Sequence, residues 1–419
     1  MVPLHRTQAV TSCPETTSMR TAHRPPARAT AIMALGALAA MLASPAQAQT
    51  PSVSVRGRIQ AQFSTVSGDS SGVFNPHAQV NSSFEIRRLR IQTDVRIGDN
   101  INLVIQPSFE MGALRMRDAY LRLILARGTT TSFGLTLGQE KKPFNRYELT
   151  SANNLPSIER GARFRGISLP AAQNNLLEDN GYLAEDIGAS ADASFLASRV
   201  QLKAGLYNGA GESSNDVNNG KTYGARATLT ALMNAEQLPL LRLGAAFISR
   251  DRGVTTTANS TEFTPDSSRR TTAFGLEAEW GDFRPGLHVI ADFATGKNLW
   301  MPAYKYNTGR NLGNVRPNTP NSAFATFSSL QVIAAWRVQF DDPTGTRLVK
   351  IIEPALRFDM TDPNTGLSND NATTITPVLN VYFSQTTVMR AGLDLYSYKT
   401  ADGASHSARA FRLSWQTSF

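Results

Sequence analysis

From about residue 53 onward, hydrophobic and polar residues alternate in short segments that end at Gly, Asn, Asp, Pro or Ser. Between Ser329 and Phe340 every second residue is hydrophobic, and the segment from Leu89 to Ile97 repeats the pattern with polar residues between. A period of two is that of a β-strand, whereas an amphipathic helix needs apolar residues three and four apart. The pattern therefore predicts a chain built almost wholly of strands.

The connections between these segments alternate in length. Tight turns are predicted at residues 98–100, 281–285, 341–346 and 384–387, and long polar stretches near residues 67–81, 140–182, 250–269, 295–325 and 361–372. A soluble β-sandwich shares the alternation within strands, but short turns on one side and long loops on the other are the plan of an outer-membrane barrel. We expect an all-β fold, a transmembrane antiparallel up-and-down β-barrel of about 16 strands around an aqueous lumen.

The N-terminus has the features of an export signal. Arg20, Arg24 and Arg28 precede an apolar run over residues 31–43, and small residues near Ala48 suit signal peptidase. The run is shorter than the roughly 20 residues that a membrane-spanning helix needs. We expect residues 1–48 to be a cleaved signal peptide, whether translation starts at Met1 or at Met19, and residues 49–419 to pass through the periplasm to a Gram-negative outer membrane.

The C-terminal segment, Phe411–Phe419, alternates and ends in an aromatic residue. It resembles the last strand of outer-membrane proteins, which the barrel assembly machinery reads. Chain termini are usually polar and frayed, so a chain that ends within an apolar strand fits a closed barrel surrounded by outer-membrane lipid.

Composition excludes several other functions. Cys13, the single cysteine, lies in the leader, so the mature chain has no thiol chemistry. Cleavage would leave 38 basic and 32 acidic side chains, and because these are scattered, nucleic-acid binding is not expected. The mature chain has His77, His288 and His406, none in a recognisable nucleophile motif. We expect a passive channel without cofactor or metal site. An outer-membrane hydrolase is the alternative function among enzymes.

Strand parity predicts a basic wall. If Val53, Val55 and Ile59 face lipid, the arginines between them face the lumen, and the last strand must pair with the first to close the barrel. The predicted lumen arginines of the first, second and last strands are Arg56, Arg58, Arg88, Arg90, Arg96 and Arg412. Glu277, Glu279 and Asp292 are predicted on the opposite flank. This predicts a transverse field, and the alternative is that the arginines simply pair with lumen carboxylates such as Asp94 and Asp394.

One region resembles a known family. Residues 138–144 (GQEKKPF), Glu148–Ser151 and Ile158–Arg160 resemble the signature of the phosphate-selective porin O and P family, with the similarity dense over about residues 55–165. The resemblance implies a 16-stranded barrel, commonly a homotrimer, with the third extracellular loop folded into the pore. Some members select phosphate or polyphosphate. Ser157 and Gly161 depart from the family pattern, which leaves the solute open.

The segment at about residues 140–182 is the third long loop, and its basic residues exceed its acidic ones by three between residues 140 and 165. The candidates for contact with anions are Lys141, Lys142, Arg160, Arg163 and Arg165. Inside a narrow pore they would attract anions, whereas on the surface they would meet lipopolysaccharide. The predicted function is passive diffusion of small hydrophilic solutes with a preference for anions. A general porin and a surface adhesin or receptor barrel are the alternatives.

Overall fold

The computed structural model describes residues 50–68, 82–110, 112–164, 167–169, 171–216, 219–251, 270–298, 325–366, 370–399 and 405–419. Residues 50–419 form one compact unit. The predicted signal peptide, residues 1–48, lies outside the described residues, as do Arg165 and His77.

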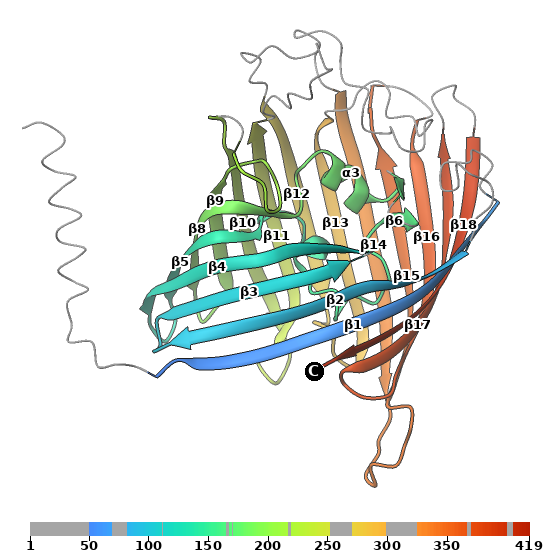
Figure 1. Ribbon diagram of the computed structural model, residues 1–419, viewed down its shortest axis with the longest axis horizontal. Coiled ribbons are helices and arrows are strands. Elements are labelled where there is room, and N and C mark those ends of the chain that lie inside the picture. The colour runs from blue at the N-terminus through green and yellow to red at the C-terminus, as the bar shows by residue number, and fades with distance from the viewer. Residues whose placement is uncertain are drawn as a thin grey trace, which may run out of the picture. The chain divides into compact units, whose positions relative to one another are not determined.

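Sixteen strands close into one antiparallel barrel, in which each strand pairs with its neighbours and β1 pairs with both β2 and β18 (Figure 1). The predicted fold is confirmed. The barrel strands are β1 (Ser52–Ser67), β2 (Ser82–Ile97), β3 (Ile101–Glu110), β4 (Ala113–Arg127), β5 (Ser132–Lys141), β8 (Glu185–Phe195), β9 (Val200–Tyr207), β10 (Thr222–Met233), β11 (Pro239–Asp251), β12 (Arg270–Trp280), β13 (Gly286–Asn298), β14 (Ala325–Gln339), β15 (Ile351–Asp362), β16 (Ala372–Tyr382), β17 (Thr387–Lys399) and β18 (Ser405–Ser418).

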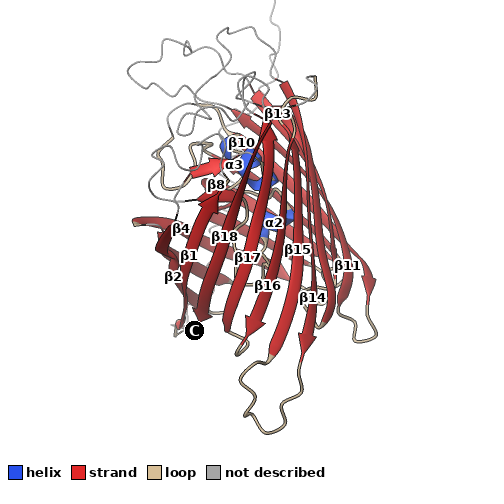
Figure 2. Ribbon diagram, turned by 90° about the vertical axis from the view of Figure 1, so that its right-hand side faces the viewer, coloured by secondary structure: helices blue, strands red, loops and turns tan. Residues whose placement is uncertain are grey.

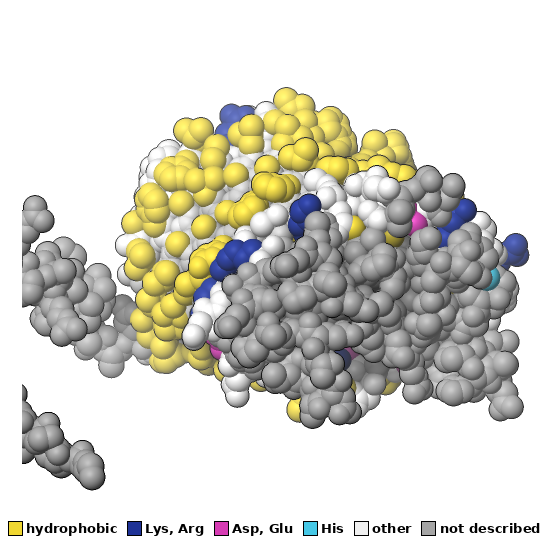
Figure 3. All heavy atoms as spheres, turned by 90° about the horizontal axis from the view of Figure 1, so that it is seen from above, with side chains coloured by type: hydrophobic (Ala, Val, Ile, Leu, Met, Phe, Trp, Pro, Cys, Tyr) yellow, Lys and Arg dark blue, Asp and Glu magenta, His cyan; other side chains and the backbone are white. Residues whose placement is uncertain are grey.

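The two faces of each strand have different chemistry. On β1, Val53 and Val55 are 62% and 58% exposed, whereas Arg58, Gln60 and Gln62 are buried. Hydrophobic side chains cover much of the outer wall that is visible from above (Figure 3). An apolar outer band over a polar interior is what lipid outside and water inside require, so the predicted parity of β1 is confirmed.

Most connections are short at one end of the barrel and long at the other. At one end, six of the seven turns are short, namely residues 98–100, 128–131, 196–199, 234–238, 281–285 and 383–386. The turn predicted at residues 341–346 is longer than expected, because β14 stops at Gln339 and residues 340–350 form a projecting connection closed by a hydrogen bond from Phe340 N to Lys350 O of 2.9 Å (Figure 2). Most connections at the opposite end are longer, and the exceptions are the two residues between β3 and β4 and the five between β17 and β18.

The seam between the first and last strands ends in a fitted contact. The backbone of Phe419 exchanges hydrogen bonds of 2.9 and 3.0 Å with Gly57 on β1. A Cβ atom built on Gly57 would lie 2.5 Å from Cζ of the Phe419 ring. Because the ring occupies the space of a side chain, an alanine at position 57 would displace the ring from its place on β1.

The connection between β5 and β8, residues 142–184, is called L3 here. It contains α2 (Arg146–Leu149), β6 (Ala162–Phe164), β7 (Ile167–Leu169) and α3 (Gln173–Asp179), and lies within the ring of strands in both ribbon views (Figures 1 and 2). Its apolar side chains form a buried cluster with the inner wall, and the cluster includes Phe144, Leu176, Leu177, Tyr182, Ile248, Ala273 and Phe327. No helix among the described residues is long and apolar enough to cross a membrane.

Candidate pore constriction

The inner faces of β1 and β2 carry the predicted arginines. Arg58 and Arg88 are 5% and 4% exposed, and Arg90 is half-buried beside them. Arg56 lies further toward the short-turn end, with 63% of its side chain exposed and Nη2 3.0 Å from Oδ2 of Asp94. Arg96 is exposed near the end of β2. The arginines thus lie along one wall, and they differ widely in burial.

A β-bulge adds one arginine that strict alternation missed. Gln60 pairs with Arg88 while Ala61 pairs with Ile86, so Arg87 is an extra residue in β2. A bulge lets two consecutive residues point to the same side, and Arg87 is as buried as Arg88, at 4% exposure. The sequence carries a signal for this, because the apolar phase shifts by one residue between Ile86 and Leu89.

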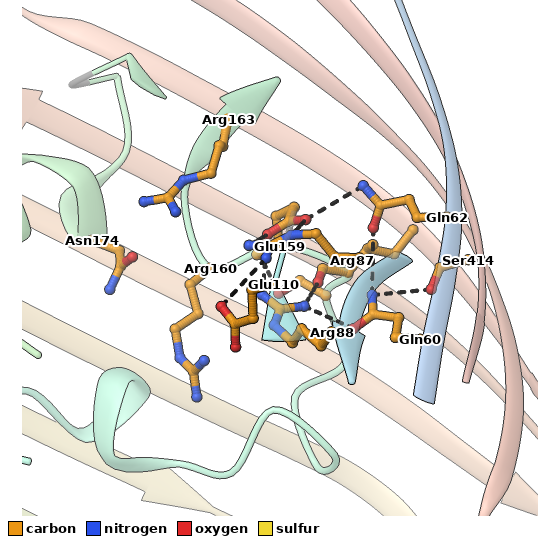
Figure 4. A network of polar contacts seen from close by, with 12 residues as sticks. Gln60, Gln62, Arg87, Arg88, Glu110, Glu159, Arg160, Arg163, Asn174 and Ser414 are labelled. Atoms are coloured by element: carbon orange, nitrogen blue, oxygen red, sulfur yellow. Dashed lines mark hydrogen bonds and ion pairs between the residues drawn. The ribbon is translucent and has the colours of Figure 1, made fainter. Parts of the chain in front are cut away.

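Glu159 of L3 forms ion pairs with both Arg87 and Arg88. Its Oε1 lies 2.5 Å from Nε of Arg87, and its Oε2 lies 2.8 Å from Nη2 of Arg87 and 3.2 Å from Nη2 of Arg88 (Figure 4). Burial raises the pKa of the Glu159 carboxyl, but the two guanidinium groups outweigh burial and hold the pKa well below its usual range. The carboxylate therefore stays ionised and ties L3 to β2.

Other lumen arginines also have carboxylate partners. Nε of Arg90 donates to Glu110 over 2.8 Å, and Nε of Arg412 donates to Asp394 over 2.8 Å. The alternative that lumen arginines simply pair with lumen carboxylates therefore holds for several arginines of the predicted wall. Arg58 differs, because no carboxylate of the described chain lies within 4.0 Å of it and its Nη1 donates only to Oδ1 of Asn153, over 2.6 Å.

A second group of charges joins the end of β5 to L3. Nζ of Lys141 is 2.6 Å from Oε1 of Glu148, and Nε of Arg160 is 3.2 Å from Oε2 of the same residue. Asn145 caps the first turn of α2 by accepting the N–H of Glu148 over 2.9 Å. Burial raises the pKa of Glu148, but the Lys141 and Arg160 cations lower it to about 2. The shared carboxylate thus fixes both cations.

Two of the cavities in the described part of the chain lie between L3 and the inner wall of β1–β4. The larger has a volume of about 420 Å³ and the smaller about 60 Å³. The larger is bordered by Phe419, which places it toward the short-turn end, and five basic and two acidic residues line it: Arg56, Arg58, Arg90, Lys141, Arg160, Asp118 and Glu185. The cavities share Arg90, Lys141, Arg160 and Glu185, so they meet at these side chains.

The remaining predicted residues have other surroundings. Arg88 and Arg163 line the smaller cavity, and Nη2 of Arg163 lies 3.0 Å from Oε2 of Glu178. Lys142 lines neither cavity, because its Nζ donates to the carbonyl of Gly181 over 3.0 Å at the base of L3. Burial there lowers the pKa of Lys142 to about 8. Arg96 and Arg412 also line neither cavity.

Two of the three acidic residues predicted on the far flank bind L3. Both oxygens of Asp292 accept backbone N–H groups at the start of α2, from Arg146 over 3.0 Å and from Tyr147 over 2.9 Å. Glu279 binds the Arg146 side chain, with Nε 2.8 Å from Oε2. Nε of Arg226 donates to Glu277 over 2.7 Å. These three carboxylates are bound by L3 or by neighbouring strands. The buried arginine without a carboxylate partner, Arg58, lies on the wall formed by β1 and β2.

Comparison with known proteins places this arrangement in a family. The family model described as phosphate-selective porin O and P matches residues 53–281, more than half of the chain. The chain belongs to the phosphate-selective porin O and P family. Membership makes it an outer-membrane porin, a channel rather than an enzyme. No curated protein sequence matches the chain.

Solved structures share the fold of this porin at low sequence identity. The outer membrane channel DcaP of Acinetobacter baumannii superposes with a TM-score of 0.55 at 13% identity, over 88% of this chain and 97% of that one. The anion-selective porin from Comamonas acidovorans gives 0.53 at 12%, over 88% and 100%. OmpT of Vibrio cholerae in its trimer form gives 0.50 at 12%, over 88% and 100%. At these identities the likeness shows the fold alone.

The two departures from the family signature have local partners in this porin. A Cβ on Gly161 would overlap the side-chain amide of Asn175, whose Oδ1 accepts the N–H of Ala162 over 2.6 Å. Ser157 Oγ donates to the carbonyl of Glu159 over 2.8 Å and contacts the Tyr147 hydroxyl. Polar contacts within L3 therefore replace the bulkier groups, and the loop keeps Glu159 and Arg160 in place.

Proposed function

We propose that this porin conducts small hydrophilic anions, phosphate among them, through the passage between L3 and the inner wall of β1–β4. The lining of the larger cavity supports this, because basic residues outnumber acidic ones by five to two. Low-dielectric walls focus the field of such charges on the passage. The family description names phosphate, and one structural neighbour is an anion-selective porin.

Arg58 is the observation that carries the proposal. The side chain is buried, lines the larger cavity and has no carboxylate of the described chain within 4.0 Å. Its Nε has no hydrogen-bond partner among the described residues. An uncompensated guanidinium beside a water-filled passage attracts carboxylate or phosphate oxygens, because its planar fork matches their geometry.

The test is the reversal potential of the refolded protein in planar bilayers under a potassium chloride gradient. Wild-type channels should prefer chloride, and Arg58→Gln should lower the chloride-to-potassium permeability ratio by about threefold or more, the effect of a unit charge about 7 Å away in water. Arg199→Gln, an exposed arginine in the turn between β8 and β9, controls for the change in net charge. Phosphate should reduce chloride current in the wild type more than in Arg58→Gln.

Three outcomes of the wild-type measurement would overturn the proposal, and a fourth, from the variants, would overturn the role of Arg58. A wild-type reversal potential near zero would indicate a general porin, and a cation preference would reverse the assignment. A folded barrel without current would fit the surface adhesin or receptor instead. Equal effects of Arg58→Gln and Arg199→Gln would remove Arg58 from the passage.

Export and assembly complete the proposal. We infer that residues 1–48 are removed in the periplasm, that the barrel assembly machinery recognises the strand ending in Phe419, and that the mature barrels form a homotrimer in contact with lipopolysaccharide. The seating of Phe419 on Gly57 supports a role for the last strand in closure, and a trimeric form of OmpT shares the fold. Sequencing of the mature N-terminus should begin at Gln49, and the native species should dissociate into monomers on heating.

A further inference from the structure

A second β-bulge places another arginine, Arg117, in the lumen. Gln106 of β3 pairs with Asp118 while Pro107 pairs with Met116, so Arg117 is the extra residue in β4. Strict alternation therefore missed Arg117 in the same way as Arg87. Its guanidinium lies among the carboxylates Glu110, Glu185 and Glu212, with N···O distances of 2.8, 3.1 and 2.8 Å.

The three carboxylates depend on Arg117 to different degrees. Glu110 also binds Arg90, whose Nε donates to it over 2.8 Å. Glu185 has no other cation of the described chain within 4.0 Å, and its side chain is 3% exposed. Glu212 has one more cation, Arg115, at 3.9 Å, and the Arg115 side chain is 52% exposed. Loss of the Arg117 charge would therefore leave Glu185, and largely Glu212, without a counter-charge.

The position of this group decides its effect on permeation. Arg117 and Glu110 line the smaller cavity, and Glu185 lines both cavities at the point where they meet. Glu110 and Glu185, once released from Arg117, would therefore add negative charge to the lining of the passage, to which Arg160 also belongs. The two walls of the constriction would then carry opposite charge, and the field favouring anions would largely cancel.

We propose that Arg117 determines the ion selectivity of the channel by offsetting part of the negative charge of Glu110, Glu185 and Glu212, and not by binding the permeating anion itself. The inference rests on the proposed function, because it explains how a constriction that contains several carboxylates can still prefer anions. Arg117 is thus a positioning residue for selectivity, and the carboxylates are the groups through which it acts.

The same arginine holds a second connection against the wall. Glu212 belongs to residues 208–221 between β9 and β10, called L4 here, and the neighbouring N–H of Ser213 donates to Oε1 of Gln139 over 2.7 Å. Nε2 of Gln139 in turn donates to the carbonyl of Arg117 over 2.7 Å. L4 and β4 are therefore joined at one point, which ties the placement of Glu212 to Arg117.

The experiment compares Arg117→Gln with Arg122→Gln. Arg122 lies on the same strand and pairs with one carboxylate, Asp192, at 2.6 Å, but it lines neither cavity. Arg117→Gln should lower the chloride-to-potassium permeability ratio by about threefold or more, Arg122→Gln should change it little, and Arg117→Lys should restore most of the preference. Equal ratios for wild type and Arg117→Gln would refute the role of Arg117.

A triple variant separates neutralisation from direct binding. If Arg117 acts through its partners, Arg117→Gln combined with Glu185→Gln and Glu212→Gln should regain at least the wild-type ratio, because two carboxylates are removed for one guanidinium. Failure to regain it in a folded triple variant would mean that Arg117 itself meets the anion, which overturns the proposal. Should Arg117→Gln not fold, Glu185→Gln alone must raise the anion preference, because Glu185 lines both cavities. A wild-type channel without anion preference would refute the proposed function independently of these variants.

Discussion

Glu159→Gln tests the contact between L3 and the barrel wall most directly. The substitution removes one charge and nearly preserves the shape of the side chain. Arg87 and Arg88 each have 5% of the side chain exposed, as does Glu159, so both guanidinium groups would lose their nearest counter-charge out of contact with water. Glu110 would remain 3.8 Å from Nη1 of Arg87.

Breaking a buried ion pair by removing one partner costs about 3–5 kcal/mol. The residual Glu110 contact and the amide oxygen of the new glutamine place the expected loss near about 3 kcal/mol. Glu178→Gln is the matched control in the same loop, because Glu178 pairs with Arg163 while 41% of its side chain is exposed. A pair exposed to this extent is worth about 1 kcal/mol or less.

Urea-induced unfolding of the two variants in lipid vesicles measures the difference. Glu159→Gln should unfold at clearly lower urea concentration than wild type, and Glu178→Gln close to it. In bilayers, Glu159→Gln should also raise the chloride preference, because Glu159 lines the smaller cavity. Equal stability of the two variants, with no change in reversal potential, would show that Glu159 does not join L3 to β2.

Three further perturbations have defined outcomes. Gly57→Ala should lower the temperature at which the folded barrel converts to the unfolded gel band, because the new Cβ overlaps the Phe419 ring, and the loss should shrink in a Phe419→Leu background. Burial raises the pKa of Glu148, but two neighbouring cations lower it to about 2, below its ordinary 4.5. The stability that ionised Glu148 contributes is therefore present above about pH 4.5 and lost toward pH 2. The difference in melting temperature between wild type and Glu148→Gln should vanish over that range. Asp292→Asn leaves one backbone N–H at the start of α2 without an acceptor, a cost of about 1–3 kcal/mol that should appear as increased current fluctuations from a loosened L3.

The alternation of hydrophobic and polar residues predicted the barrel well, because every strand has one face toward lipid and one toward water, whatever its neighbours are. The parity of Val53, Val55 and Arg58 followed from a period of two and is confirmed by their exposure. The same rule missed Arg87 and Arg117, since a bulge is an irregularity in the pairing of two strands. The shifted apolar phase between Ile86 and Leu89 was the one local sign of the first bulge.

The sequence by itself determined the chemistry of each face: which side chains meet lipid, where strands end, and that the interior is rich in arginine. Only the tertiary structure decided which of those charges stay uncompensated. Glu159 meets Arg87, and Asp292 meets the backbone of Tyr147, across 72 and 145 residues of chain. Coulomb energy depends on distance through space and on burial, so the difference between paired Arg88 and unpaired Arg58 arises only when L3 packs against the wall.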